Sequence, residues 1–287
     1  MATTQPPADP EADPRVKAVF DDIRATRKTD FINNLWRALA FDPGLLESTW
    51  TDVKRLMATP TLLDPLTKEM VYIAVSVANS CSYCVHSHTT AARAKGMSES
   101  EKLLYRSNLL GSDKRVTNYG GGNTSAKVME RDPLTGGMVE VLWVKGSGGD
   151  IGSMKLDGFA TLYMTKLMQL RGQYRGLDQE DAMVEALGHT IFNLNPRAPS
   201  IDTWLHGFVP KAHVDHVHSD AVIAIAASAD QVRLTQEIFG GELGYLPWQR
   251  PGIDLGIKLG RMAEENPKLK GVVLGQHGLF TWADTAK

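Results

Sequence analysis

The feature that most constrains the fold is a change of pattern near residue 102. From Arg15 to about Lys102, apolar residues recur at three- and four-residue spacing, which predicts amphipathic helices. After Tyr105, glycines become frequent and short strand-like runs alternate with helical segments, a pattern typical of layered α/β domains. We therefore expect an all-α N-terminal helical module followed by an α/β domain with layered α/β/α architecture.

The chain has 287 residues, enough for two domains of ordinary size. Residues 1–13 contain Pro, Ala and Asp without apolar periodicity, so we expect a disordered tail there. The helical module then covers residues 14–101 and the α/β domain residues 102–287. In the helical module we predict a helix that starts at Pro65 after an Asp64 cap. In the α/β domain we predict strands at 139–144, 214–218 and 272–274. We also predict helices there at 159–170, 180–187, 221–227, 231–238 and 255–264.

Composition excludes several classes of function. The chain carries 31 basic and 33 acidic residues, a balance that gives no electrostatic reason to bind nucleic acid or an anionic membrane. Its longest strongly apolar run, residues 221–227, is too short to span a bilayer, and residues 1–14 do not resemble a signal peptide. We therefore expect a cytoplasmic protein, in which two cysteines indicate redox or metal chemistry rather than a structural disulfide.

The two cysteines, Cys81 and Cys84, belong to a constellation with redox character. Glu69 precedes Cys81 by twelve residues, and His88 follows Cys84 by one helical turn on the same face. A thiol at a helix N-terminus has a lowered pKa, because the helix dipole and free N–H groups stabilise the thiolate. Glu69 has apolar neighbours, so we expect its carboxyl to have a raised pKa and to relay protons to the dithiol with His88.

Two other interpretations of this constellation remain open. Cys81, Cys84 and His88 could be ligands of a structural zinc, with His86 as the nearest candidate for a fourth ligand. They could also be ordinary residues of an inert helical hairpin.

At these residues the sequence resembles the alkyl hydroperoxidase D and carboxymuconolactone decarboxylase family. Glu69, Cys81, Cys84 and His88 match the family pattern at every spacing, and the resemblance extends over roughly residues 31–100. It implies a dithiol–disulfide cycle that reduces a peroxide and is restored by a thiol reductant. By the same resemblance, Cys84 attacks the peroxide and Cys81 resolves the product. The chain departs from some members at Tyr83, where they carry His.

Three histidines far downstream predict a metal site. His216 and His218 are two residues apart in a predicted strand, so both can reach one ion. His277, which we expect to end the strand beginning near Val272, would add a third imidazole. Three neutral imidazoles with one open position suit a catalytic zinc or another divalent metal, and Asp202 could remove a proton next to a substrate carbonyl. We interpret the nearby His206 and His213 as ordinary core or surface histidines.

Two Gly-rich segments, at residues 119–125 and 145–150, offer clustered backbone N–H groups that could hold a phosphate. Neither segment has the Walker or Rossmann spacing, so we expect no organic cofactor.

From about residue 104 to Lys287, the sequence resembles the class II aldolase and adducin family, and in particular the aldolase half of bifunctional rhamnulose-1-phosphate aldolase/alcohol dehydrogenases. The matching segments are residues 106–111, 118–125, 143–150, 198–203 and 278–282. The resemblance implies that His216, His218 and His277 bind the metal and that Asn123, Ser147, Gly148 and Ser200 bind a substrate phosphate. Asp202 falls where simpler aldolases have a catalytic Glu.

The two resemblances together imply a zinc-dependent aldolase that cleaves a phosphorylated sugar, a ketose 1-phosphate of the rhamnulose-1-phosphate kind, and that carries a hydroperoxidase-like module. One alternative is a thiol-dependent peroxidase with an inactive aldolase portion, and another is a non-catalytic adducin-like or chimeric protein. Members of both families form oligomers, so we expect a homo-oligomer. Family members continue beyond the end of each matched segment, so we also expect both modules to be truncated.

Overall fold

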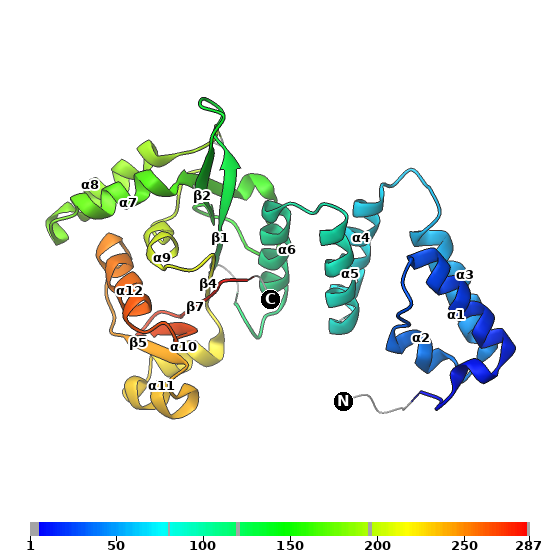
Figure 1. Cartoon of the computed structure of the whole chain (residues 1–287). Coiled ribbons are helices and arrows are strands. Elements are labelled where there is room, and N and C mark those ends of the chain that lie inside the picture. The colour runs from blue at the N-terminus through cyan, green and yellow to red at the C-terminus, as the bar shows by residue number, and fades with distance from the viewer. Residues whose placement is uncertain (1–5, 80, 119–120, 195–196, 286–287) are drawn as a thin grey trace. The chain divides into compact units, whose positions relative to one another are not determined.

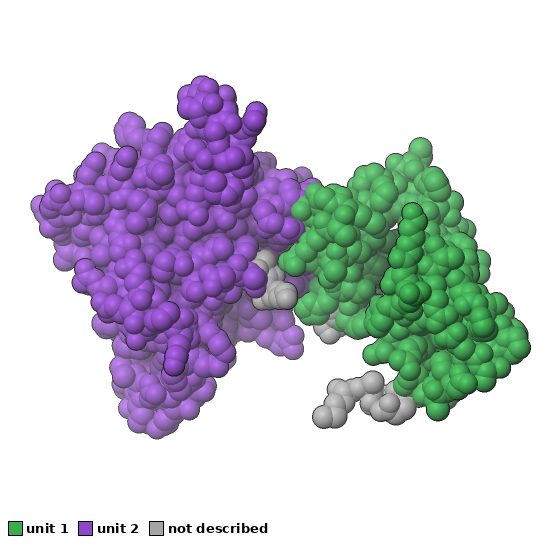
Figure 2. Space-filling model, viewed as in Figure 1, with its two compact units in different colours: residues 1–97 green, residues 98–287 purple. Residues whose placement is uncertain are grey.

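The computed structural model describes residues 6–79, 81–118, 121–194 and 197–285. The chain forms two compact units, Met1–Met97 and Ser98–Lys287, which Figure 2 shows in different colours. The second unit starts four residues before the predicted boundary, because α6 (Glu99–Ser112) packs on the first strand of the sheet. No helix in the described parts of the chain is long and apolar enough to cross a membrane.

The first unit is helical, as the sequence predicts. Proline at the first position and a capping aspartate start several of its helices; Asp42 Oδ1 accepts the Leu45 N–H at 3.0 Å, and Asp64 Oδ1 accepts the Leu66 N–H at 2.9 Å. Its elements are the 3-10 helix η1 (Pro10–Ala12), α1 (Pro14–Arg27), α2 (Asn34–Leu39), α3 (Pro43–Met57), α4 (Pro65–Ala78) and α5 (Ser82–Ala94), labelled in Figure 1.

The core of this unit lies between α1, α2 and α3. Trp36 and Trp50 pack edge to face with ring centroids 5.4 Å apart, and the buried residues around them are Val16, Val19, Phe20, Ile23, Ile32, Ala40 and Leu46. Helices α4 and α5 form a hairpin. Part of the segment that we expected to be disordered has structure, because it contains η1 and because Glu11 pairs with Arg24 at 2.6 Å.

The second unit is built on one seven-stranded sheet with the order β3-β2-β1-β4-β7-β6-β5. All neighbouring strands are antiparallel except β5 and β6, which are parallel. The strands are β1 (Asn123–Arg131), β2 (Met138–Lys145), β3 (Phe159–Tyr163), β4 (His213–Val217), β5 (Leu243–Leu246), β6 (Gly271–Leu274) and β7 (Leu279–Ala283).

Helices cover both faces of this sheet. Val272 and Val273 are neighbours on β6, and their side chains belong to two different apolar clusters because successive strand residues face opposite sides. The Val272 side carries the main core, with α7 (Met164–Gln173), α9 (Thr203–Phe208) and α12 (Ile253–Glu265); α8 (Glu180–Ala186) contacts α12. The other side carries α6, α10 (Asp220–Ala226) and α11 (Gln231–Phe239). The predicted layered α/β/α architecture is confirmed.

Several segment predictions differ from the structure. The predicted helix at 159–170 starts with five residues of strand β3, because its apolar run Phe159 to Leu162 is buried throughout and such a run has no period that separates strand from helix. Strands β1, β5 and β7 were not predicted. His277 does not end a strand: β6 stops at Leu274, and His277 lies in the turn before β7.

Candidate functional sites

The cysteines lie where α5 begins. Cys81 is the N-cap residue of α5, and its sulfur accepts the Cys84 N–H at 3.4 Å. The hydrogen bond between the two thiols and, to a smaller extent, this backbone hydrogen bond lower the pKa of Cys81. Burial and the neighbouring Cys81 sulfur raise the pKa of Cys84. In this conformation Cys81 is therefore the thiol that ionises first.

Glu69 projects from α4 and connects the rest of the site. One carboxylate oxygen is 2.6 Å from His88 Nδ1, and the other is hydrogen-bonded to Lys95 Nζ. Burial raises the pKa of Glu69, but His88 and Lys95 outweigh burial and the net shift is downward. The expectation of a raised pKa is therefore wrong. The sequence reasoning missed Lys95, which follows α5 by one residue and is one helical turn past Ala91.

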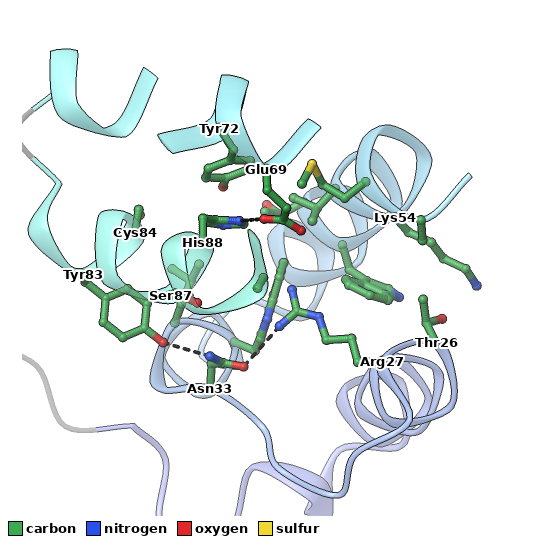
Figure 3. A pocket seen from close by; sticks show the side chains of 18 of the residues that line it. Thr26, Arg27, Asn33, Lys54, Glu69, Tyr72, Tyr83, Cys84, Ser87 and His88 are labelled. Atoms are coloured by element: carbon green, nitrogen blue, oxygen red, sulfur yellow. Dashed lines mark hydrogen bonds and ion pairs between the residues drawn. The ribbon is translucent and has the colours of Figure 1, made fainter. Parts of the chain in front are cut away.

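Tyr72 is a second residue that the sequence reasoning missed. It lies on α4, and its ring stacks on the His88 ring with centroids 3.6 Å apart. Its position three residues after Glu69, on the same helical face, was the available signal. Figure 3 shows Tyr72 and Glu69 of α4 beside His88, which lies on α5 together with Cys84.

The arrangement gives no support to a zinc site at the cysteines. His88 directs Nδ1 to Glu69, and His86 is exposed. Among the described residues, the three-member cluster of possible ligands whose atoms converge is His216, His218 and His277.

These three histidines converge from two parts of the second unit. His216 lies on β4 and His218 directly follows it, while His277 comes from the turn between β6 and β7. The antiparallel pairing of β4 with β7 places Val217 opposite Leu279 and so brings that turn to the end of β4. Their ligand atoms lie within 4.8 Å of one another, and His216 Nε2 is 2.9 Å from His218 Nε2.

The surroundings of the cluster favour the neutral form of each imidazole. Burial lowers the pKa of all three imidazoles, most strongly at His216, where the neighbouring histidines lower it further. His216 Nδ1 is 3.0 Å from the Leu279 carbonyl oxygen, and because a carbonyl can only accept, Nδ1 donates and Nε2 keeps its lone pair. Three neutral nitrogen donors fit a divalent ion such as zinc, with a further position left for a substrate.

Two glycines allow the imidazoles this close approach. A Cβ atom on Gly121 would lie 2.1 Å from His218 Nδ1, and one on Gly278 would lie 2.7 Å from His218 Cδ2. Any larger residue at either position would displace His218. The Gly-rich segment at 119–125 therefore has a packing role at Gly121, whereas its residues 119–120 lie outside the described parts.

Asp202 is at the N-cap position of α9, beside this cluster, and its side chain makes no capping hydrogen bond. Burial raises its pKa, and the nearby His277 and Lys145 partly offset the shift. A carboxyl with a raised pKa is a better proton acceptor near neutral pH than an exposed one. Lys145 ends β2, and burial lowers its pKa whereas Asp202 raises it. In the sequence, Lys145 stands out only as the first residue of a Gly-rich segment, since nothing local indicates that its ammonium is buried.

The four candidate phosphate residues are brought together. Asn123 Nδ2 donates to Ser200 Oγ at 2.7 Å and approaches the Lys145 carbonyl oxygen at 3.5 Å. Ser147 and Gly148 follow in the next loop, where Gly148 has a positive φ of 74° and the Ser147 N–H donates to the Ala198 carbonyl oxygen at 2.9 Å. Asn123 also pairs with His216 across β1 and β4, so the group adjoins the histidines.

Two other histidines of this unit, His206 and His213, are not part of the cluster. His206 is fully buried on α9; its Nδ1 is 2.8 Å from Ser125 Oγ, and burial lowers its pKa to about 3. His213 Nδ1 is 2.8 Å from Arg106 Nη1, and Arg106 Nε donates to Asp215 Oδ1 at 3.1 Å. His206 Nε2 is buried without a hydrogen-bond partner among the described residues, whereas His213 belongs to a polar group with Arg106.

The two families that match this chain meet near the boundary between its two units. Residues 101–287 match the model of the class II aldolase and adducin N-terminal domain, and residues 45–103 match that of the carboxymuconolactone decarboxylase family. A curated relative is "Uncharacterized oxidoreductase YuxG" from Bacillus subtilis, 40% identical over 187 residues, which are 65% of this chain. The chain spans only 27% of that relative's length.

Two solved structures are similar. The N-terminal class II aldolase domain of a protein from Thermoplasma acidophilum is 33% identical, with a TM-score of 0.59, covering 66% of this chain and 85% of that one. The alkylhydroperoxidase AhpD core from Rhodospirillum rubrum is 58% identical, with a TM-score of 0.36, covering 38% of this chain and 82% of that one.

Proposed function

Because the chain belongs to the class II aldolase and adducin N-terminal domain family, we propose that residues 98–287 form a metal-dependent aldolase acting on a ketose 1-phosphate. The observation that carries the proposal is the convergence of three uncharged imidazoles, His216, His218 and His277, next to a carboxyl with a raised pKa. When bound there, a divalent metal such as zinc would act as a Lewis acid that polarises a substrate oxygen.

The residues of this chain then have distinct tasks. Asn123, Ser147, Gly148 and Ser200 hold the phosphate through amide, hydroxyl and backbone N–H groups. In the synthesis direction, Asp202 accepts a proton from the carbon next to the carbonyl of dihydroxyacetone phosphate. In the cleavage direction, Asp202 takes the proton of the hydroxyl on the carbon that becomes the aldehyde, the carbon–carbon bond breaks, and Asp202 gives this proton to the carbon next to the carbonyl.

Metal content and aldol cleavage on one preparation test this proposal. We expect about one zinc per chain, removal of zinc by a chelator with loss of cleavage of rhamnulose 1-phosphate, and recovery when zinc is added. A purified protein that holds no divalent metal and is not activated by zinc would contradict the proposal and favour a non-catalytic adducin-like role.

We propose a second activity for the first unit, a thiol-dependent peroxidase. The supporting observation is a cavity of about 530 Å³ that is lined by Cys84, His88, Glu69 and Tyr72 but not by Cys81. A peroxide in this cavity therefore meets Cys84 first, although Cys81 is the thiol that ionises more readily.

In the proposed cycle, peroxide oxidises Cys84 and Cys81 then resolves the product. The Cys84 thiolate attacks the distal peroxide oxygen, the O–O bond breaks, the alcohol leaves with a proton, and Cys84 becomes a sulfenic acid. The Cys81 thiol attacks this sulfur, which releases water and forms the disulfide, and a dithiol reductant restores both thiols. Glu69 and His88, 2.6 Å apart, carry the proton between the thiols and the leaving alcohol.

Trapping with dimedone, which labels sulfenic acids, distinguishes the two cysteines. In Cys81→Ser we expect peroxide to produce a label on Cys84, because the resolving thiol is gone. If the label instead appears on Cys81 in Cys84→Ser and is absent from Cys84 in Cys81→Ser, the roles are reversed.

We also propose that the chain forms a homo-oligomer. In the first unit, a groove of about 680 Å³ is lined by apolar side chains that remain exposed, among them Leu62, Leu63, Val71 and Val75. An apolar surface of this kind is typical of a protein interface. Light scattering on the full chain tests this, and a well-folded monomer at micromolar concentration would contradict it.

A further inference from the structure

The cavity beside Cys84 has the size and walls of a small-molecule site. Its volume of about 530 Å³ falls within the roughly 300–1,000 Å³ that such sites occupy. Aromatic side chains form much of its wall, namely Trp36, Trp50, Tyr72 and Tyr83. Helices from both halves of the first unit contribute, since Trp36 lies on α2 and Tyr83 on α5. An aromatic wall of this kind favours an apolar or aromatic ligand body.

The cavity is also cationic. Its lining includes three cations, Arg27, Lys54 and Lys95, and one carboxylate, Glu69. Lys54 is paired with Asp22 at 2.7 Å, and Lys95 is paired with Glu69. Both oxygens of Glu69 are occupied, by His88 and Lys95, so its charge is compensated and repels an incoming anion little.

Arg27 differs from the two lysines because its guanidinium keeps N–H donors that can bind a ligand. Its guanidinium lies over the rings of Trp36 and Trp50, 5.4 and 5.5 Å from their centroids, and donates to Asn33 Oδ1 at 3.1 Å. Asn33 in turn donates to the Tyr83 hydroxyl at 3.1 Å, as the dashed lines in Figure 3 show. Within the described parts of the chain, no carboxylate forms an ion pair with Arg27. A guanidinium has five N–H donors in a planar fork that matches a carboxylate.

We propose that this cavity binds an organic anion whose carboxylate is held by Arg27 and whose apolar body lies along the aromatic wall. The inference rests on the proposed peroxidase chemistry for its substrate class, which is an organic hydroperoxide that carries a carboxylate. Arg27 is on α1 and Cys84 on α5, and Figure 3 shows them at separate places around the cavity. Binding by the carboxylate therefore leaves the other end of the ligand free to reach the thiol.

The test uses the full chain with Cys84→Ser, so that no turnover interferes, and a pair of unreactive probes of equal shape. These probes are 4-isopropylbenzoate and the neutral 4-isopropylbenzamide, titrated by calorimetry and by quenching of tryptophan fluorescence. We expect the carboxylate to bind about tenfold more tightly than the amide, because a charge-assisted bidentate contact has that order of strength. We expect Arg27→Gln to bring the two affinities within about twofold of each other.

Two further variants keep the test decisive. Arg37→Gln removes an exposed arginine of α2 that does not line the cavity, and it should leave the preference for the carboxylate intact. Arg27→Lys keeps the charge but loses the planar fork, so an intermediate preference is expected even if Arg27→Gln folds poorly. Equal binding of the two probes, an undiminished preference in Arg27→Gln, or no binding of either probe would overturn the proposal.

The outcome also separates this inference from the proposed peroxidase. If the chain with both cysteines prefers the carboxylate probe but does not reduce cumene hydroperoxide, the anion site stands and the peroxidase proposal fails. If it reduces cumene hydroperoxide but binds both probes equally, the anion site fails and the peroxidase proposal stands.

Discussion

The thiol site and the histidine site differ in how the chain assembles them. Glu69, Cys81, Cys84 and His88 belong to one helical hairpin, in which the helical repeat of α5 aligns Cys84 with His88 and the packing of α4 on α5 brings Glu69 to His88. The histidine site gathers residues from β4, from the turn between β6 and β7, and from the start of α9. The first site therefore depends on the helical repeat of α5 and on one helix–helix contact, whereas the second depends on the register of a seven-stranded sheet.

The two sites also control charge differently. At the thiol site, Lys95 and His88 compensate the buried Glu69 carboxylate and lower its pKa. At the histidine site, burial keeps the imidazoles neutral, so that their lone pairs remain available. One site holds an ion pair, whereas the other favours neutral side chains.

The largest expected effect is on the histidine site alone. His216→Ala combined with His218→Ala should remove the metal and lower aldol cleavage by more than about 100-fold, since even changes outside the ligand shell cost 10–100-fold. Peroxide reduction should be unchanged, because the variant alters no residue of α4 or α5. Metal analysis and both assays check this, with His189→Ala, an exposed histidine of the same unit, as the control.

A second variant isolates the thiol site. Cys84→Ser should bring peroxide reduction to background, since a serine hydroxyl cannot be oxidised by peroxide, and should leave the metal content unchanged. Plasma emission spectrometry and a peroxide assay on one preparation measure both. Loss of zinc from Cys84→Ser would contradict the assignment of separate chemistries to the two sites, because it would make the cysteines metal ligands.

A smaller effect is expected from the ion pair at Glu69. Lys95→Met should raise the pKa of Glu69 and reduce peroxide turnover by about tenfold or less, the order of one charge-assisted hydrogen bond to a partly exposed lysine. The acid limb of the pH–rate profile should move to higher pH. Lys95→Arg, which keeps the charge, should move this limb much less. An unmoved limb in Lys95→Met would show that Lys95 does not control the charge of Glu69.

The smallest expected effect is a difference between the two units in how much stability they lose in acid. The pKa of His206 falls from 6.5 to about 3 in the folded chain, so its contribution to stability is present above pH 6.5 and is lost as the pH falls toward 3. Glu69 has an ordinary pKa of 4.5 that is lowered on folding, so its contribution is lost only below pH 4.5. The raised pKa values of Asp202 and Asp215 act in the opposite sense and offset part of the loss in the second unit.

We therefore expect metal-free protein to lose stability in the second unit first, with a fall of about 5 °C in melting temperature between pH 7 and pH 5. Thermal scans combined with proteolysis and mass spectrometry assign the transition to a unit. His206→Gln should reduce the dependence on pH, and the remaining part belongs to His216, His218 and His277, whose pKa values are also lowered by burial. An earlier loss in residues 6–79 than in the second unit would contradict the expectation.

Much of the fold was predictable because its signals are local. Asp64 followed by Pro65 starts α4 as expected, and the change of periodicity near residue 102 separates the helical unit from the α/β unit. The short strands were harder to predict. Phe159 to Leu162 is buried on both faces, and β5 and β7 have only four and five residues, too few to establish a period of two.

The residue types and spacings of both sites were visible in the sequence, since a helical turn or a pair of alternate strand residues needs no distant partner. Only the tertiary structure decided which residues surround the side chains of each site. Lys95 reverses the expected shift at Glu69, pairing of β4 with β7 brings His277 to His216, and the packing of α1 against α2 and α3 sets Arg27 over two tryptophan rings. These contacts join segments whose separation along the chain carries no periodic signal, and burial, which sets each charge state, exists only once the chain has folded.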